Sequence, residues 1–376
     1  MPDSQQTRRL TMAITELDVG GAEKAFVQVA CGLKSIGWEV RVISVRDSGL
    51  LANALKTAGI PVTPLNAGSF PDVRAIWRMS SELKRNPCDI LLTFLHQANI
   101  VGRIAGRLAG VQQIISGVRV ADRRWSVIIP ERLTWRMVDR YVSVSNSVAH
   151  VHQKVCRIAD DRMTVIPNGV DGDAIQAALP ADRRTLQWGE RDKIILCVGR
   201  LSKQKAPLDM LEAFEFVRSN PRLSGFPVRL VYVGDGPLRK ELEQRIREKA
   251  LQNEVRILGW RSDVWSLMKA ADMLVLPSHW EGLPNVILEA QAVGLPVAAS
   301  DVDGCKELIE DRRTGRLFPP GDTQRLAEVV AEVLTFDAEI QESSRLAREK
   351  VQANHQWVQC IMKYDELLKW TGTVRK

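Results

Sequence analysis

The segment Leu274-Val-Leu-Pro-Ser-His-Trp-Glu281-Gly-Leu-Pro-Asn-Val-Ile-Leu-Glu289 predicts a strand, a loop and a helix in immediate succession. The apolar run Met273 to Leu276 has the length and composition of a buried strand. Gly282 frees the backbone of the loop, and Pro284 occupies a position that is favoured at the start of a helix. This succession is typical of the repeating unit of a parallel α/β sheet.

Two carboxylates of this segment, Glu281 on the loop and Glu289 in the helix, are separated by seven residues. At about 1.5 Å per residue along the helical part, they can contact opposite ends of one extended ligand. The backbone N–H groups of the helix start lie between them and favour an anion such as a diphosphate. A ligand with hydroxyls at both ends and a diphosphate between them is a nucleotide sugar. The competing interpretation is two solvated carboxylates near a helix start.

The segment resembles the E-x7-E motif of the retaining glycosyltransferases of family 4, and the following Ala-Gln-Ala-Val-Gly-Leu-Pro-Val-Ala-Ala-Ser of residues 290–300 continues the resemblance. The resemblance implies that Glu281 contacts the donor sugar and that Glu289 contacts the ribose. It also implies that Gly282 and Leu283 lie beside the donor. We therefore expect the later half of the chain to bind the nucleotide sugar.

The resemblance covers essentially the whole chain, most strongly residues 194–320 and more loosely residues 14–170. It implies a GT-B fold, with two doubly wound Rossmann-like α/β domains that face each other across a cleft. It also implies a retaining, metal-independent transfer of a sugar from a nucleoside diphosphate sugar to an acceptor hydroxyl. We expect a UDP-sugar donor, no cofactor, and a glycan or lipid-linked acceptor in lipopolysaccharide, exopolysaccharide or other glycoconjugate biosynthesis.

The composition fits two domains, because 376 residues are many for one hydrophobic core and 45% of them are hydrophobic. No run of about 18 uninterrupted apolar residues occurs, and the first residues lack an apolar signal core, so we expect a cytoplasmic protein. Six cysteines without C-x-x-C spacing predict reduced packing residues, and five dispersed histidines predict no metal cluster.

Short Val/Ile/Leu-rich runs alternate with amphipathic segments of helix length, which predicts parallel strands with crossover helices. The runs are 10–15, 40–45, 61–65, 90–95, 113–118, 141–145 and 163–167, followed by 194–199, 228–234, 255–259, 273–277, 296–300 and 315–318. We expect an acceptor-side domain over 1–175 and a donor-binding domain over 176–355, with the polar stretch 171–192 as the linker. The resemblance implies that a last helix, within 356–376, returns to the first domain.

A basic loop follows the expected strand 194–199 and carries Arg200 and Lys205. Cations just past the carboxyl end of a strand can neutralise the charge of a departing diphosphate in place of a metal ion. The resemblance assigns Arg200 and Lys205 to that role, with Lys203 as a nearby competitor. Ala206 stands where the family usually has glycine, which leaves the shape of the loop open. A solvated basic turn is the alternative interpretation.

Glycine-containing loops follow several other expected strands, and glycine lets the backbone approach a ligand closely. A tight turn would also need glycine, so the glycines alone do not indicate a binding site. The resemblance implies that these loops lie beside the donor. The donor or nucleotide contacts expected from them are Gly20, Gly21, Gly199, Gly234, Asp235, Gly259 and Trp260.

His96 directly follows the expected strand 90–95 and precedes a helix. A histidine at a strand end can donate to a sugar hydroxyl or to an oxygen that develops charge. The resemblance implies a contact with the donor sugar, whereas a structural histidine is the alternative. We interpret His150, His152 and His355 as helix-surface residues.

The formal charge of +7 is concentrated in residues 1–180, which hold 22 Lys and Arg against 16 Asp and Glu. No nucleic-acid-binding motif accompanies this charge, so an anionic membrane surface or a phosphate-bearing acceptor fits better. The segment Arg119 to Arg140 mixes arginines with Trp125, Trp135 and aliphatic residues. It is typical either of a membrane-surface segment or of an ordinary crossover helix, and Pro130 predicts that it is not one regular helix.

Two other functions share these features. An epimerase of the same architecture would act on the nucleotide sugar without an acceptor. A non-catalytic protein that binds nucleotide sugars at a membrane assembly would show donor binding and no turnover. Both remain alternatives to a glycosyltransferase that is cytoplasmic or peripheral at the inner face of the membrane.

Overall fold

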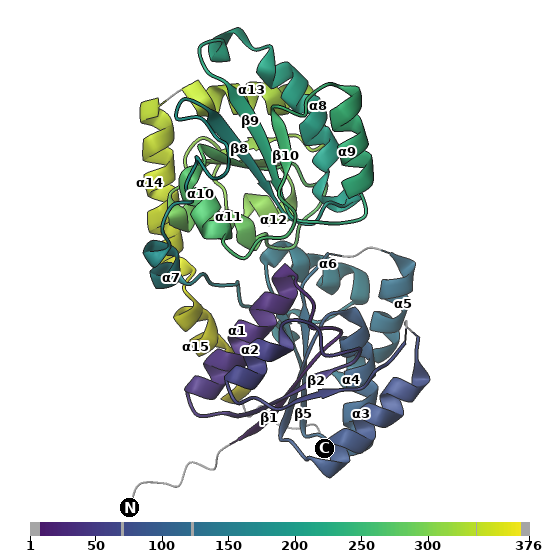
Figure 1. Cartoon of the computed structure of the whole chain (residues 1–376). Helices are drawn as coiled ribbons and strands as arrows, with labels where there is room; N and C mark the ends of the chain where they lie inside the picture. Colours follow the sequence, from purple (N-terminus) through teal and green to yellow (C-terminus); the bar gives the residue numbers. More distant parts are fainter. Residues whose placement is uncertain (1–7, 69–70, 122–123, 336, 370–376) are drawn as a thin grey trace, which may run out of the picture. The chain divides into compact units, whose positions relative to one another are not determined.

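The computed structural model describes residues 8–68, 71–121, 124–335 and 337–369, and the chain divides into two compact units. The first unit runs to Gly169 and takes up the chain again at Trp357, and the second unit is Val170–Gln356. Each unit is a parallel sheet covered by helices, as Figure 1 shows. The predicted α/β class with two Rossmann-like domains is confirmed.

The first unit contains a seven-stranded parallel sheet in the order β3-β2-β1-β4-β5-β6-β7. Its strands are β1 Arg9–Ile14, β2 Glu39–Ser44, β3 Val62–Pro64, β4 Ile90–Phe94, β5 Gln113–Val118, β6 Arg140–Ser143 and β7 Met163–Val165. The chain leaves β1 toward β2 on one side and later returns to β4 on the other. The carboxyl ends of β1 and β4 therefore form the switch point at which doubly wound sheets bind ligands.

Helices cover both faces of the first sheet (Figure 1). They are α1 Gly21–Ser35, α2 Ala52–Thr57, α3 Val73–Arg85, α4 His96–Ala109, α5 Trp125–Thr134, α6 Asn146–Cys156 and α15 Trp357–Lys369, with 3-10 turns at Trp135–Met137 and Asp160–Arg162. Successive residues of β1 point to opposite faces, so Met12 packs in the cluster of α1 and α15 and Ala13 in that of α3 and α4. The last helix, α15, packs beside α1 through Tyr364 and Leu368.

The second unit contains a six-stranded parallel sheet in the order β10-β9-β8-β11-β12-β13. Its strands are β8 Lys193–Val198, β9 Val228–Val233, β10 Val255–Ile257, β11 Met273–Leu276, β12 Val297–Ser300 and β13 Arg316–Phe318. Its helices are α7 Gly172–Ala177, α8 Pro207–Arg218, α9 Arg239–Glu248, α10 Val264–Ala270, α11 Asn285–Val293, α12 Asp303–Lys306, α13 Thr323–Thr335 and α14 Asp337–Asn354, with 3-10 turns at Lys203–Lys205 and Pro221–Leu223. The switch point of this sheet lies between β8 and β11.

The polar segment 171–192, which its composition predicts to be a linker, is part of the second unit. It contains α7, and Ile175 and Trp188 are buried in the hydrophobic cluster that packs on β8 and β11. Two apolar side chains thus hold a polar segment on the domain. The chain divides between Gly169 and Val170, before this segment.

The segment 119–140 is not one regular helix, as expected, since α5 covers only Trp125–Thr134 of it. The break does not fall at Pro130, however, because α5 runs through the proline. A proline inside a helix removes one backbone donor and crowds the preceding turn. Here the loss is offset by the burial of Val127 and Ile128 on one side of the same helix. Residues 122 and 123, which precede α5, lie outside the described residues.

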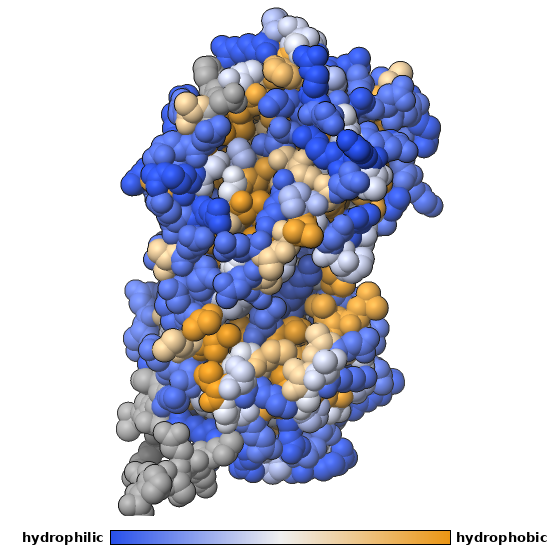
Figure 2. All heavy atoms as spheres, turned by 60° about the vertical axis from the view of Figure 1, so that its left-hand side comes forward, coloured by the Kyte–Doolittle hydropathy of each residue, from blue (hydrophilic) through white to orange (hydrophobic). Residues whose placement is uncertain are grey.

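The distribution of hydrophobic residues on the surface and the state of the cysteines are those of an ordinary α/β protein. On the face shown in Figure 2, hydrophilic residues dominate and hydrophobic ones form small groups on each unit. No helix among the described residues combines the length and the apolar character needed to cross a membrane. The six cysteines are free, and four of them are buried.

Candidate active site

The loop after β8 brings the predicted cations to the switch point of the second sheet. Arg200 is exposed directly after Gly199, and Lys205 closes a 3-10 turn that begins at Lys203. Ala206 then adopts a left-handed conformation with φ 45° and ψ 51°, from which α8 begins. The sequence leaves the shape of this loop open, because Ala206 stands where the family usually has glycine. In the structure, alanine takes the left-handed conformation that glycine would adopt more readily.

The loop after β11 meets this basic loop through a buried carboxylate. Glu281 is 8% exposed, and its Oε1 lies 2.5 Å from the Nζ of Lys205. The backbone also joins the loops, since the N–H of His279 donates to the oxygen of Gln204 at 2.8 Å. The Gln204 side chain donates to the oxygen of Trp280 at 3.0 Å. Lys205 and Glu281 are 76 positions apart in the sequence, and the contacts between the two loops hold them together.

Glycines at the ends of β8, β9 and β10 let three loops approach one another. A Cβ on Gly234 would lie 2.1 Å from the oxygen of Gly199, and its φ of 141° disfavours other residues. The N–H of Gly234 donates to the oxygen of Gly259 at 2.7 Å. Gly234 is therefore required by the backbone itself, whether or not a ligand approaches it.

The side chain of Asp235 forms hydrogen bonds within its own loop. Its carboxylate accepts from the N–H of Gly236 and from Arg239, each at 2.7 Å. These two hydrogen bonds lower the pKa of Asp235. The side chain thus shapes the turn before α9, while Trp260, in the next loop, is 57% exposed.

Helix α11 supplies the second carboxylate of the motif. It begins at Asn285, directly after the loop of Glu281, and Pro284 occupies its N-cap position. Glu289 is half-buried on this helix. A Cβ on Gly304 of α12 would lie 2.7 Å from the oxygen of Gly282, so α12 supports the loop from the other side.

The first unit places His96 at its own switch point. Phe94, the last residue of β4, contacts Phe26 of α1 and Tyr364 of α15 at ring distances of 5.3 and 6.3 Å. Leu95 follows with φ 72° and ψ 156°, and His96 is the first residue of α4. The loop after β1 carries Gly20 and Gly21 at the start of α1, and β1 and β4 are neighbours.

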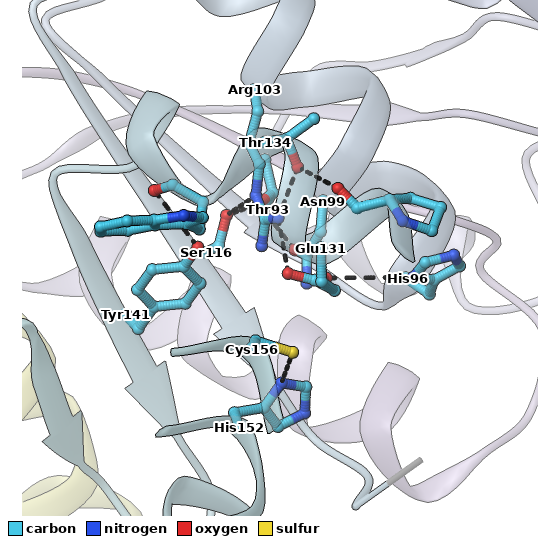
Figure 3. Close-up of polar contacts among 12 residues, drawn as sticks. Thr93, His96, Asn99, Arg103, Ser116, Glu131, Thr134, Tyr141, His152 and Cys156 are labelled. Carbon is cyan, nitrogen blue, oxygen red and sulfur yellow. Dashed lines mark hydrogen bonds and ion pairs between the residues drawn. The ribbon is translucent and has the colours of Figure 1, made fainter. Parts of the chain in front are cut away.

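Behind His96 lies a buried ionic cluster, which Figure 3 shows. Glu131 of α5 is 1% exposed, its Oε2 lies 2.6 Å from Arg103, and its Oε1 lies 3.9 Å from the Nδ1 of His96. Burial acts to raise the pKa of Glu131, but the charge of Arg103, supported by His96 and His152, outweighs it and lowers the pKa from 4.5 to about 2. Glu131 is therefore a buried anion at neutral pH.

Two family models match the chain, one after the other. The model described as Glycosyltransferase Family 4 matches residues 19–174, and the model described as Glycosyl transferases group 1 matches residues 180–350. Together they span the loops that carry His96, Arg200, Lys205 and Glu281. The chain is a group 1 glycosyltransferase.

Named relatives of this glycosyltransferase transfer sugars. The UDP-Gal:alpha-D-GlcNAc-diphosphoundecaprenol alpha-1,3-galactosyltransferase of Escherichia coli is 29% identical over 313 residues, which are 80% of each chain. The alpha-D-kanosaminyltransferase of Streptomyces kanamyceticus is 36% identical over 174 residues, which are 45% of this chain and 43% of the relative. The crystal structure of Anabaena HepE in complex with UDP-glucose is 21% identical with a TM-score of 0.83, covering 96% of this chain and 99% of HepE. The last likeness concerns the GT-B fold alone.

The second unit of the glycosyltransferase thus gathers most of the predicted donor residues at one sheet edge, and the first unit gathers Gly20, Gly21 and His96 at another. Among the described residues, no group of His, Cys, Asp and Glu is arranged to hold a metal ion. The sequence interpretation missed Gln204, which ties the two donor loops, and the pair of Arg103 and Glu131. An arginine on the apolar side of α4 is the one local signal for that pair.

His152 is also not the helix-surface residue that the sequence interpretation expects. It is 5% exposed, and its Nε2 lies 3.1 Å from the oxygen of Val120. The buried residues Val148, His152 and Cys156 recur every four positions, which is the spacing of one helix side.

Proposed function

We propose that this glycosyltransferase moves a sugar from a nucleoside diphosphate sugar, with a UDP-sugar as the first candidate, to an acceptor hydroxyl with retention of configuration and without a metal ion. The observation that carries the proposal is the pairing of Lys205 with Glu281 at the shared edge of β8 and β11, with Arg200 in the same loop. The name of the E. coli relative supports the donor, since it gives UDP-Gal.

In this proposal the leaving diphosphate binds between the basic loop and the start of α11. Arg200 and Lys205 neutralise the charge that grows on the diphosphate, which is the interaction that lowers the barrier most. Glu281 lies against the sugar, and Lys205 fixes its carboxylate at 2.5 Å. Glu289, farther along α11, binds the ribose hydroxyls. Side chains thus supply the positive charge that a metal ion supplies in other transferases.

We further propose a phosphate-bearing, lipid-linked acceptor and a peripheral contact with an anionic membrane. On α5, Trp125, Ile129 and Leu133 recur every four residues and are 70, 52 and 76% exposed. Arg132 and Arg136 are exposed beside them. An apolar row flanked by arginines fits the boundary of a bilayer that carries negative headgroups. The diphosphoundecaprenol in the name of the E. coli relative supports such an acceptor.

A donor screen tests the enzymatic part. Thermal stabilisation of the purified protein is measured with UDP, GDP and ADP, and then turnover of the matching sugar donors is measured with and without candidate acceptors and EDTA. We expect stabilisation by UDP, acceptor-dependent release of UDP, and no effect of EDTA. Isomerisation of the donor without an acceptor would show an epimerase, and binding without turnover would show a binding protein.

Vesicle flotation tests the membrane part. We expect the wild type to bind vesicles of phosphatidylglycerol and phosphatidylcholine and not vesicles of phosphatidylcholine alone. The double variant Trp125→Ser/Leu133→Ser should lose this binding. The control is Trp77→Ser on α3, because Trp77 is 65% exposed on another helix of the same unit. Equal binding by the double variant and the control would refute the contact.

A further inference from the structure

Arg103 of α4 is a fully buried cation, and Figure 3 shows the side chains around it. Its Nη1 donates to Glu131 at 2.6 Å and to Thr134 at 3.0 Å, and its Nε donates to Ser116 at 3.0 Å. Its guanidinium also lies 5.3 Å from the ring centre of Tyr141. These contacts fix the guanidinium, and through it they fix the position of the Glu131 carboxylate.

A buried ion pair is a costly way to hold two helices together. Removing both charges from water costs several kcal/mol per ion, and apolar side chains of the same volume often stabilise a fold equally well. Stability alone therefore does not account for Arg103 and Glu131 in the contact between α4 and α5. The pair calls for another role that needs a fixed negative charge.

The second oxygen of Glu131 indicates that role. Arg103 engages Oε2, whereas Oε1 lies 3.9 Å from the Nδ1 of His96. His96 and Arg103 are seven residues apart on α4, which places them on the same side of the helix two turns apart. One carboxylate on α5 thus faces both side chains, and it turns one oxygen to each.

The backbone beside His96 is strained as well. Leu95 has φ 72°, a conformation that costs a bulky residue on the order of 1–3 kcal/mol. The residue lies between the last residue of β4 and His96, and its conformation sets the direction in which α4 starts. The backbone strain at Leu95 and the burial of the Arg103–Glu131 pair each cost free energy, independently of one another. Both features determine where the imidazole of His96 lies.

We propose that Glu131, fixed by Arg103, is a positioning residue for His96, which it turns so that Nδ1 faces the carboxylate. The neutral ring then carries its proton on Nδ1 and presents Nε2 as a hydrogen-bond acceptor. His96 therefore accepts a hydrogen bond from a donor-sugar hydroxyl. This inference rests on the proposed function, in which His96 contacts the donor.

A double-mutant cycle tests whether Glu131 acts through His96. The rate of UDP release is measured for the wild type, Glu131→Gln, His96→Ala and the double variant. We expect Glu131→Gln to lower kcat about tenfold when His96 is present and less than twofold in the His96→Ala background. The same factor in both backgrounds would show a purely structural role and overturn the proposal.

Thr134→Val is the matched control for the cycle. It removes a neighbouring partner of Arg103 and leaves the carboxylate of Glu131 in place. Because Glu131 and its contact with Arg103 remain, kcat should change less than twofold with His96 and with His96→Ala. A loss of kcat as large as that of Glu131→Gln, and equal in both backgrounds, would assign the effect to packing around Arg103 and would overturn the proposal.

Nuclear magnetic resonance of the wild-type protein tests the orientation without any variant in the cluster. With 15N-labelled histidine, and His96→Gln used only to assign the signal, the neutral ring should carry its proton on Nδ1. A neutral ring protonated on Nε2 would overturn the proposal even if Glu131→Gln does not fold. The spectrum does not depend on turnover. A protein that releases no UDP would therefore count against the proposed function, whereas the spectrum alone would test the positioning of His96.

Discussion

Removing Lys205 should separate stability from catalysis in the second unit. In Lys205→Met the carboxylate of Glu281, whose side chain is 6% exposed, loses the partner that lies 2.5 Å away. Losing one partner of a buried pair costs about 3–5 kcal/mol, and the 23% exposure of the Lys205 side chain lets water replace part of that interaction. We therefore expect unfolding of the second unit to require about 2 kcal/mol less free energy. We also expect kcat to fall at least about a hundredfold, the scale for losing a charge partner of the transition state.

The double variant Lys205→Met/Glu281→Gln makes the test decisive. It removes both charges, so its stability should return to within about 1 kcal/mol of the wild type while kcat stays low. Urea denaturation followed by tryptophan fluorescence gives the stabilities, with Trp188 as a buried reporter in the second unit. A single variant that keeps wild-type stability, or a double variant that is no more stable than the single one, would refute the coupling of the pair.

Three further changes follow from the described contacts. Glu289→Ala should weaken UDP binding about tenfold or more, as for the loss of a charged hydrogen bond, and unchanged affinity in calorimetry would remove Glu289 from the ribose site. Ala206→Gly should raise the free energy of unfolding by about 1 kcal/mol, because glycine adopts φ 45° without the strain of alanine, and a lower urea midpoint would contradict this. The lowered pKa of Glu131 stabilises the fold above pH 4.5, and this contribution should disappear as the pH falls toward about 2. Glu131→Gln should flatten that part of the curve of stability against pH, and a curve parallel to that of the wild type would contradict it.

The strands and the order of the two units were accessible from the sequence because buried parallel strands are continuous apolar runs that end at glycine, proline or polar residues. The loops with Arg200, Lys205 and Glu281 follow those runs, so their meeting at one sheet edge was predictable from the α/β alternation alone. The direct contact between Lys205 and Glu281 was not, because it depends on the exact path of two loops that are 76 residues apart.

Other features depend on tertiary packing that local rules do not describe. Local rules predict that a proline ends a helix, but α5 continues through Pro130 because its neighbours are buried. Residues 171–192 are polar overall, yet Ile175 and Trp188 are buried. The pair of Arg103 and Glu131 joins two helices over 28 residues, and charged residues are ordinarily expected at the surface.

The central claim is that cations in the loop after β8 stabilise a leaving nucleoside diphosphate. The direct test is the steady-state rate of UDP release from the selected sugar donor by Arg200→Ala, with Lys203→Ala as the control, because both residues are exposed in the same loop. The account predicts that kcat falls about a hundredfold or more for Arg200→Ala and less than twofold for Lys203→Ala. Equal losses in the two variants, or an effect of Arg200→Ala that is confined to KM, would contradict it.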